Sequence, residues 1–227
     1  MAATIDELNH NSSAEVMAIL KKVAIVFCDF DGVIKDSVPA KAVGFEQLFL
    51  QYGTDVACRV RQHHEAHGGT SRYEKMPIYL GWVGEPATAE RIQEFADRFS
   101  KLVYQAVIDS PWVPGVREYL LTHHLRQRFV LLTATPQDEI QAILHALGIA
   151  HCFDQVFGAP TRKATAMADT LQRMCCATKD AVMIGDSESD LEAAHANDVT
   201  FLLRCTTTNQ LLQRRYTGLR FEDLVDE

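Results

Sequence analysis

Residues 28–37 read CDFDGVIKDS, and they follow directly on an apolar run at 23–28, VAIVFC. A short apolar run of this kind is typical of a strand buried on both faces, as in a parallel sheet. Asp29 and Asp31 are two positions apart, so in an extended segment they point to the same side. Gly32 lets the chain turn sharply directly afterwards. The stretch therefore predicts a buried strand that ends in a pair of carboxylates.

Similar apolar runs along the chain predict further strands, and helical patterns lie between them. The expected strands are 129–132, 155–157, 181–184 and 200–203, and the expected helices are 116–124, 138–147, 165–174 and 187–196. Gly148 follows the second of these helices, where a C-terminal cap is expected. Buried strands that alternate with helices predict an α/β fold, a Rossmann-like parallel sheet with helices on both faces.

One region interrupts the alternation. Residues 38–108 contain no strand signal, only helical patterns at 41–52, 56–66, 73–82 and 88–108. Pro111, Pro114 and Gly115 then mark the return to the sheet. We therefore expect a catalytic core made of residues 1–37 and 109–227, with an all-helical domain inserted at 38–108.

Polar residues follow two other predicted strands in the same way. Thr133, Ala134 and Thr135 come after the strand at 129–132, and residues 185–190, GDSESD, follow the strand at 181–184. In open α/β sheets, ligands bind outside the carboxyl ends of the strands. The sequence therefore predicts that carboxylates and hydroxyls from three strands gather at one edge of the sheet.

These motifs, taken in order, resemble the four motifs of the haloacid dehalogenase superfamily. Residues 29–37 are similar to the first motif, Thr133 to the second, Lys163 to the third, and residues 185–190 to the fourth. The match covers residues 22–204, and the helical insert lies where the family carries a helical cap. The chain thus resembles the branch of phosphoglycolate phosphatases and β-phosphoglucomutases.

The resemblance implies a role for each motif residue. Asp29 would be the nucleophile that forms an aspartyl-phosphate, and Asp31 would protonate the leaving oxygen and then activate water. Thr133 and the N–H of Ala134 would hold phosphate oxygens, while Lys163 would neutralise charge on the nucleophile and the phosphate. These roles suit phosphoryl transfer, which depends on positioning and on charge neutralisation.

The resemblance also implies a bound Mg²⁺, a hard ion that prefers oxygen ligands. Its expected ligands are the Asp29 carboxylate, the Asp31 backbone carbonyl and Asp186. Asp190, one helical turn after Asp186, belongs to the same metal group and would support the metal-bound waters or Lys163.

Simpler structural explanations exist for several of these residues. An Asp-x-Asp pair can be a turn with side-chain bonds to its own backbone, and Ser187 with Asp190 forms a capping-box pattern at a helix start. Arg162 competes with Lys163 for the third motif. His63 and His67, at i and i+4, could bind zinc or lie at a solvated helix end.

The most distinctive segment of the insert is residues 68–72, GGTSR. It resembles the cap loop of β-phosphoglucomutase and related sugar-phosphate enzymes, which implies that Gly69, Ser71 and Arg72 face the substrate. The planar guanidinium of Arg72 suits a carboxylate, a second phosphate or sugar hydroxyls. Alternatively, Arg72 pairs with a carboxylate of the insert, Glu74 or Glu65. His67 and Lys75 are further candidates in this region.

Four functions are weighed against these motifs. The first is a Mg²⁺-dependent phosphatase of a small phosphorylated metabolite, a sugar phosphate or a phosphorylated acid; the alternative is a phosphomutase. Against the mutase, its pattern has a histidine where this chain has Lys41. A haloacid dehalogenase lacks the second aspartate of the first motif, so Asp31 argues against that reaction. A non-catalytic interaction protein would be expected to lose Asp29 or Asp186.

Composition limits the partners and the location. Among 227 residues, 22 Lys and Arg stand against 30 Asp and Glu, a net charge of −8. Nucleic acid and anionic membranes attract positive proteins, so neither is an expected partner. The six cysteines form no CxxC pair and predict free thiols, and the first 22 residues are too polar for a signal peptide. We expect a cytoplasmic monomer or homodimer that acts on a small phosphorylated molecule.

Overall fold

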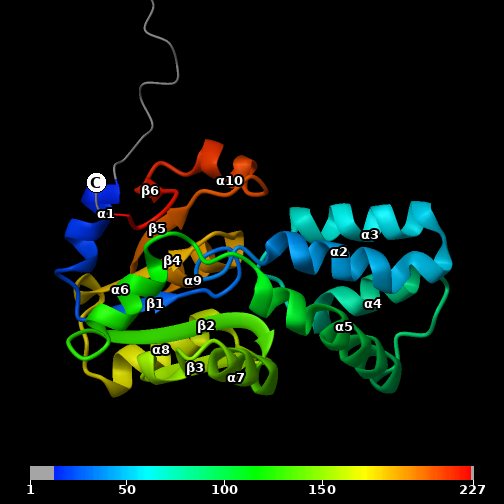
Figure 1. Ribbon diagram of the computed structural model, residues 1–227, viewed down its shortest axis with the longest axis horizontal. Coiled ribbons are helices and arrows are strands. Elements are labelled where there is room, and N and C mark those ends of the chain that lie inside the picture. Colours follow the sequence, from blue (N-terminus) through cyan, green and yellow to red (C-terminus); the bar gives the residue numbers. More distant parts are fainter. Residues whose placement is uncertain (1–12, 226–227) are drawn as a thin grey trace, which may run out of the picture.

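The computed structural model describes residues 13–225, and a parallel sheet forms its core (Figure 1). Its strands lie in the order β3-β2-β1-β4-β5-β6, and every neighbouring pair is parallel. The bounds are β1 Ile25–Cys28, β2 Arg128–Pro136, β3 Gln155–Ala159, β4 Ala181–Gly185, β5 Thr200–Arg204 and β6 Arg220–Phe221. The predicted α/β class with a Rossmann-like parallel sheet is confirmed.

Helices cover both faces of this sheet. They are α1 Ser13–Leu20, α6 Val116–His123, α7 Gln137–Ala146, α8 Lys163–Arg173, α9 Glu188–Ala196 and α10 Gln210–Arg215. Alternate residues of a strand point to opposite faces. Ile25 and Phe27 of β1 accordingly pack in the same cluster as α8 and α9, while Val26 and Cys28 pack with α1 and α6. All four residues are buried, which explains why the strand is continuously apolar.

The insert between β1 and β2 is helical, and Figure 1 shows it as a group beside the sheet. It contains α2 Val38–Phe49, a 3-10 turn at Leu50–Tyr52, α3 Thr54–Ala66, α4 Arg72–Trp82 and α5 Ala89–Asp109. Buried aromatic rings fill its interior, among them Phe45, Phe49, Tyr79, Phe95 and Phe99. We call this group the cap. The expected limits of the inserted domain, 38 and 108, stay a proposal. The expected core also includes residues 1–12 and 226–227, which lie outside the residues that the structure describes.

The strand register brings the motif-bearing segments level with one another. Cys28 pairs with Leu131 of β2 on one side and with Ile184 of β4 on the other. The N–H of Asp29 donates to the carbonyl of Ile184 at 3.0 Å, which extends this pairing by one residue. The segments that follow β1, β2 and β4 therefore meet at one edge, as the sequence predicts.

Candidate active site

The loop after β1 brings the first motif against Asp186. The backbone N–H of Phe30 donates to Oδ1 of Asp29 at 2.7 Å, which fixes that buried carboxylate. Gly32 has φ +76°, and a Cβ built there would lie 2.1 Å from Oδ2 of Asp186. Only glycine leaves room for both the turn and the neighbouring carboxylate. Asp29 and Asp186 are thus neighbours although they are far apart in sequence.

Lys163 is the basic partner of the nucleophile candidate. Its Nζ lies 2.8 Å from Oδ2 of Asp29 and 2.7 Å from Oδ1 of Asp190. Burial opposes the charge on Lys163, but Asp190 and Asp29 outweigh it and raise its pKa. The competing Arg162 is exposed. The structure therefore brings Lys163, and not Arg162, into the site.

Asp190 positions Lys163 and takes part in the capping box at the start of helix α9. Its Oδ1 accepts from Lys163, and its Oδ2 accepts from the N–H and the hydroxyl of Ser187, at 3.1 and 2.6 Å. The capping-box pattern read from the sequence is therefore present. Because both carboxylate oxygens are engaged, Asp190 is placed as a support for Lys163. Asp190 also belongs to the aspartate group that could hold a metal, so its place among the expected metal residues stays a prediction.

The aspartates form a buried carboxylate cluster. Asp29, Asp186 and Asp190 each offer an oxygen, and the three oxygens lie within 4.8 Å of one another. Burial and repulsion from Asp29 and Asp190 raise the pKa of Asp186 well above its ordinary value. Burial is also the main cause that raises the pKa of Asp29, and Lys163 opposes it. Such a cluster calls for a further positive charge, and its oxygen donors suit a hard divalent cation such as Mg²⁺.

Asp31 has a separate set of partners, two of which sequence reasoning missed. Lys41 of α2 pairs directly with Oδ2 of Asp31, and its Nζ also lies 2.7 Å from the hydroxyl of Thr135. The hydroxyls of Ser37 and Thr135 donate to the same carboxylate at 2.6 and 3.2 Å. Burial alone would raise the pKa of Asp31, but Lys41 and these hydrogen bonds lower it below its ordinary value. Asp31 is therefore held ionised.

The second motif sits beside these carboxylates. Thr133 is buried at the end of β2, and its hydroxyl accepts from the N–H of Thr135 at 3.2 Å. Ala134 lines the same cavity as Asp29, Asp31 and Asp186. This backbone is thus placed at the cavity wall, where an N–H can meet an oxyanion.

The cavity has a volume of about 530 Å³ and lies between the cap and the sheet edge. The cap loop closes against the start of α9 at Gly69, which has φ +76°. A Cβ on Gly69 would lie 2.3 Å from the hydroxyl of Ser187 and 2.2 Å from that of Ser189. The backbone of the cap at Gly69 therefore packs directly against the serine side chains at the start of α9.

Two other predicted cap residues take structural positions. The guanidinium of Arg72 binds both oxygens of Glu139 on α7, at 2.8 and 2.7 Å, and also contacts Ser100 of α5. Both side chains of this ion pair are buried, so Arg72 links cap and core. Arg72 also lines the cavity, and its substrate-facing role stays a prediction. Its partner is neither Glu74 nor Glu65. Ser71 likewise caps α4, where its hydroxyl accepts from the N–H of Tyr73.

His63 of α3 and His67, which follows that helix, do not form a group of metal ligands in the described residues. Nδ1 of His63 lies 3.1 Å from the Tyr79 hydroxyl, and its ring stacks on His67 at 4.0 Å. Within residues 13–225, the aspartate cluster is the one group of three or more side chains arranged to hold a metal.

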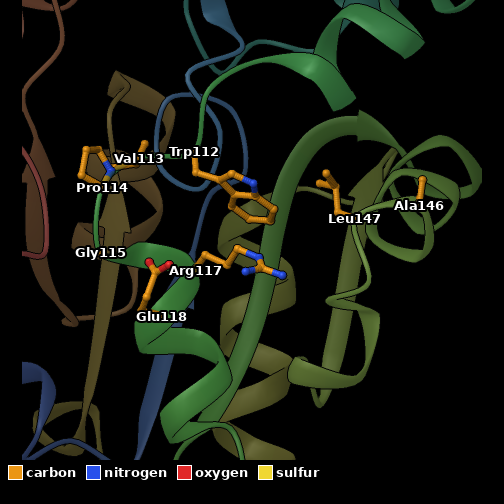
Figure 2. A pocket seen from close by; sticks show the side chains of 8 residues that line it. All are labelled: Trp112, Val113, Pro114, Gly115, Arg117, Glu118, Ala146 and Leu147. Atoms are coloured by element: carbon orange, nitrogen blue, oxygen red, sulfur yellow. The ribbon is translucent and has the colours of Figure 1, made fainter.

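A second hollow of about 610 Å³ lies on the linker after the cap (Figure 2). Trp112, Arg117 and Glu118 line it together with Leu147 of the α7 end, and Figure 2 shows Arg117 beneath the indole of Trp112. It shares no lining residue with the cavity at the sheet edge. It contains no group of carboxylates or nucleophiles, so the chemistry belongs to the first cavity.

Buried charges in a cavity oppose folding, and such groups are expected where a function requires them. The particular family follows from comparison: residues 23–198 match the haloacid dehalogenase-like hydrolases, and the chain belongs to that family.

Curated relatives agree with this assignment, and solved structures share the fold. A phosphoglycolate phosphatase of Vibrio cholerae is 25% identical over 186 residues, covering 77% of this chain and 81% of that protein. One from Pseudomonas putida is also 25% identical, covering 77% and 66%. A β-phosphoglucomutase structure from Clostridium difficile has a TM-score of 0.69 at 17% identity, covering 89% of this chain and 92% of the other.

These findings confirm the expected family and the expectation of an enzyme, a hydrolase in the branch that contains phosphatases. The six cysteines are free thiols. None of the helices in residues 13–225 is both long and apolar enough to cross a membrane.

Proposed function

We propose that the protein is a Mg²⁺-dependent phosphatase that hydrolyses a small phosphorylated metabolite through an aspartyl-phosphate on Asp29. The observation that carries the proposal is the placement of Asp29. Its carboxylate lies in the cavity, 2.8 Å from the Lys163 amine and beside Asp186. A fixed carboxylate with a neutralising lysine suits a nucleophile for phosphorus.

Two displacements at phosphorus complete the reaction. An oxygen of Asp29 bonds to phosphorus while the bond to the leaving oxygen breaks, and the leaving oxygen takes a proton from Asp31. Asp31 then removes a proton from water, whose oxygen bonds to phosphorus and releases Asp29. Thr133 and the Ala134 N–H hold the phosphoryl oxygens during both steps.

Before substrate binds, the contacts of Asp31 favour its role as the base that activates water. Paired with Lys41, it is ionised, which suits the base that activates water. The acid role requires that Asp31 gains a proton as substrate enters and the ion pair with Lys41 loosens.

The Mg²⁺ would be held by Asp29, Asp186 and the backbone carbonyl of Asp31, with Asp190 supporting the site through Lys163. Such an ion would supply positive charge beside the phosphate. It would also offset the burial and the repulsion from neighbouring carboxylates, which raise the pKa of Asp186.

The substrate is a sugar phosphate or a phosphorylated acid, and the relatives named phosphoglycolate phosphatase favour the acid. A phosphomutase is the alternative, because the cap packs on the core at Gly69 and could exclude water. A monomer or homodimer in the cytoplasm stays our expectation, with neither nucleic acid nor membrane as partner.

Phosphate release tests the proposal. The protein is incubated with phosphorylated sugars, sugar acids and phosphoglycolate, each with Mg²⁺ and with EDTA, and Asp29→Asn serves as the inactive control. We expect Mg²⁺-dependent release from the wild type and none from the Asp29→Asn variant, because a carboxamide is not a nucleophile. Silence across the panel, with isomerisation of a hexose 1-phosphate when a bisphosphate is added, would favour the mutase.

A further inference from the structure

Lys75 is a buried cation on the cap side of the cavity, and the proposed reaction gives it no role. It lies on α4, is 1% exposed, and lines the cavity that holds Asp29 and Asp31. Its amine donates to Nδ1 of His64 at 3.0 Å. An ammonium removed from water is costly unless an anion or several acceptors replace its hydration.

Lys75 lacks the anion that the other cations of this cavity possess. In the described part of the chain, no carboxylate oxygen lies within 4 Å of its amine, whereas each remaining lysine or arginine that lines the cavity is ion-paired. Those pairs are Lys41 with Asp31, Arg72 with Glu139 and Arg215 with Glu188.

His64 does not supply the missing negative charge. Burial, followed by the charge of Lys75, keeps the pKa of His64 well below its ordinary value, so the ring is neutral. Since an ammonium can only donate, Nδ1 of His64 is the acceptor and its proton lies on Nε2. The ring thus orients Lys75 and leaves its charge without a counter-ion.

The charges around Lys75 also show that it lacks a nearby negative charge. Burial first, and then repulsion from Lys41, lower the pKa of Lys75 to about 7, while Glu74 and Asp31 oppose this more weakly. An anion bound in the cavity would restore the ordinary preference of Lys75 for its charged form.

We propose that Lys75 binds a carboxylate of the substrate, and hence that the enzyme selects small phosphorylated acids over phosphate esters with neutral tails. The inference rests on the proposed function, in which Asp29 and Lys163 receive the phosphoryl group at the sheet edge. Lys75 then receives the tail from the cap. One ammonium matches one carboxylate, whereas a second phosphate would bring more negative charge than this part of the cavity can neutralise.

The test compares two substrates of similar size in three proteins. The substrates are 2-phosphoglycolate, which carries a carboxylate, and ethyl phosphate, which does not. The proteins are the wild type, Lys75→Met and, as matched control, Lys101→Met, which removes an exposed lysine of α5. Methionine keeps an unbranched side chain in the buried position, and the ratio of kcat/KM for the two substrates is compared within each folded protein.

We expect the wild type and Lys101→Met to prefer the acid, and Lys75→Met to reduce that preference by about 10- to 100-fold, as for a lost charge-assisted hydrogen bond. The inference is overturned if the preference survives in Lys75→Met, or if the wild type shows none. It is also overturned if a hexose bisphosphate is the favoured substrate and its kcat/KM falls more than that of 2-phosphoglycolate in Lys75→Met. Absence of phosphate release by the wild type from both esters and from the whole panel of phosphorylated sugars and acids would instead contradict the proposed function.

Discussion

The buried ion pair between Arg72 and Glu139 is predicted to hold the cap on the core, and its removal tests that role. The pair is bidentate and its side chains are 3% and 8% exposed. Replacing Arg72 by methionine leaves the Glu139 carboxylate buried with only Ser100 as partner, at 2.5 Å. Breaking one side of a buried pair costs about 3–5 kcal/mol. We expect Arg72→Met and Glu139→Met each to lower the free energy of unfolding by about that amount.

The double variant separates an ion pair from mere packing. With both charges gone, no buried charge is left unpaired, and the apolar side chain at position 72 lies near the Phe99 ring, which the Arg72 guanidinium now covers at 4.6 Å. The double variant should therefore lose less stability than either single variant.

Equilibrium urea unfolding of the wild type, the two single variants and the double variant gives these free energies. Arg61→Met is the control, since its pair with Glu46 is 41% and 35% exposed and such pairs contribute about 0–1 kcal/mol. The reasoning is refuted if the single variants cost no more than this control, or if the two single losses simply add.

Three further predictions concern the cavity. The charge of Lys75 is present below and lost above about pH 7. The value of kcat/KM for a phosphorylated acid should therefore fall as pH rises through 7, while the value for ethyl phosphate should not. Parallel pH profiles for the two substrates would contradict this. Gly69→Ala should reduce kcat/KM more than Gly84→Ala does, because only Gly69 has Ser187 and Ser189 in the way of a Cβ; equal kinetics would contradict the close packing. Lys41→Met should raise the pKa of Asp31 and move the acidic limb of the kcat profile to higher pH; an unchanged limb would contradict their coupling.

The sheet and the carboxylate edge were predictable because their signals are local. A strand buried on both faces must be continuously apolar, which is what residues 23–28 show, and the residues after it must lie at a sheet edge. Asp29 and Asp186 could therefore be placed together before any contact was known. The sequence favoured Lys163 over Arg162 without excluding Arg162, since adjacent basic residues at a helix start look alike in sequence, and the structure places Lys163 against Asp29.

Short elements were missed for a related reason. Helices α1 and α10 and the strand β6, which spans Arg220–Phe221, are too short for a period to show. Their positions depend on packing against the sheet rather than on their own patterns.

The cap contacts were not predictable, because they join residues far apart in sequence. Lys41 meets Thr135 across 94 positions, and Arg72 meets Glu139 across 67. A lysine within an otherwise apolar stretch of α2 was the one signal for Lys41, and it did not identify Asp31 as its partner. For Arg72, the sequence predicted a substrate or a cap carboxylate, whereas Glu139 lies on a core helix.

The central claim is that Asp29 is phosphorylated during turnover, and mass spectrometry tests it most directly. The protein is mixed with 2-phosphoglycolate and Mg²⁺, quenched in acid within the first turnovers, treated with borohydride and digested. An aspartyl-phosphate is thereby reduced to homoserine, and the account predicts this change at Asp29 in the wild type and not in Asp29→Asn. Phosphate release by the wild type with Asp29 unmodified throughout, or release by Asp29→Asn at the wild-type rate, would contradict it.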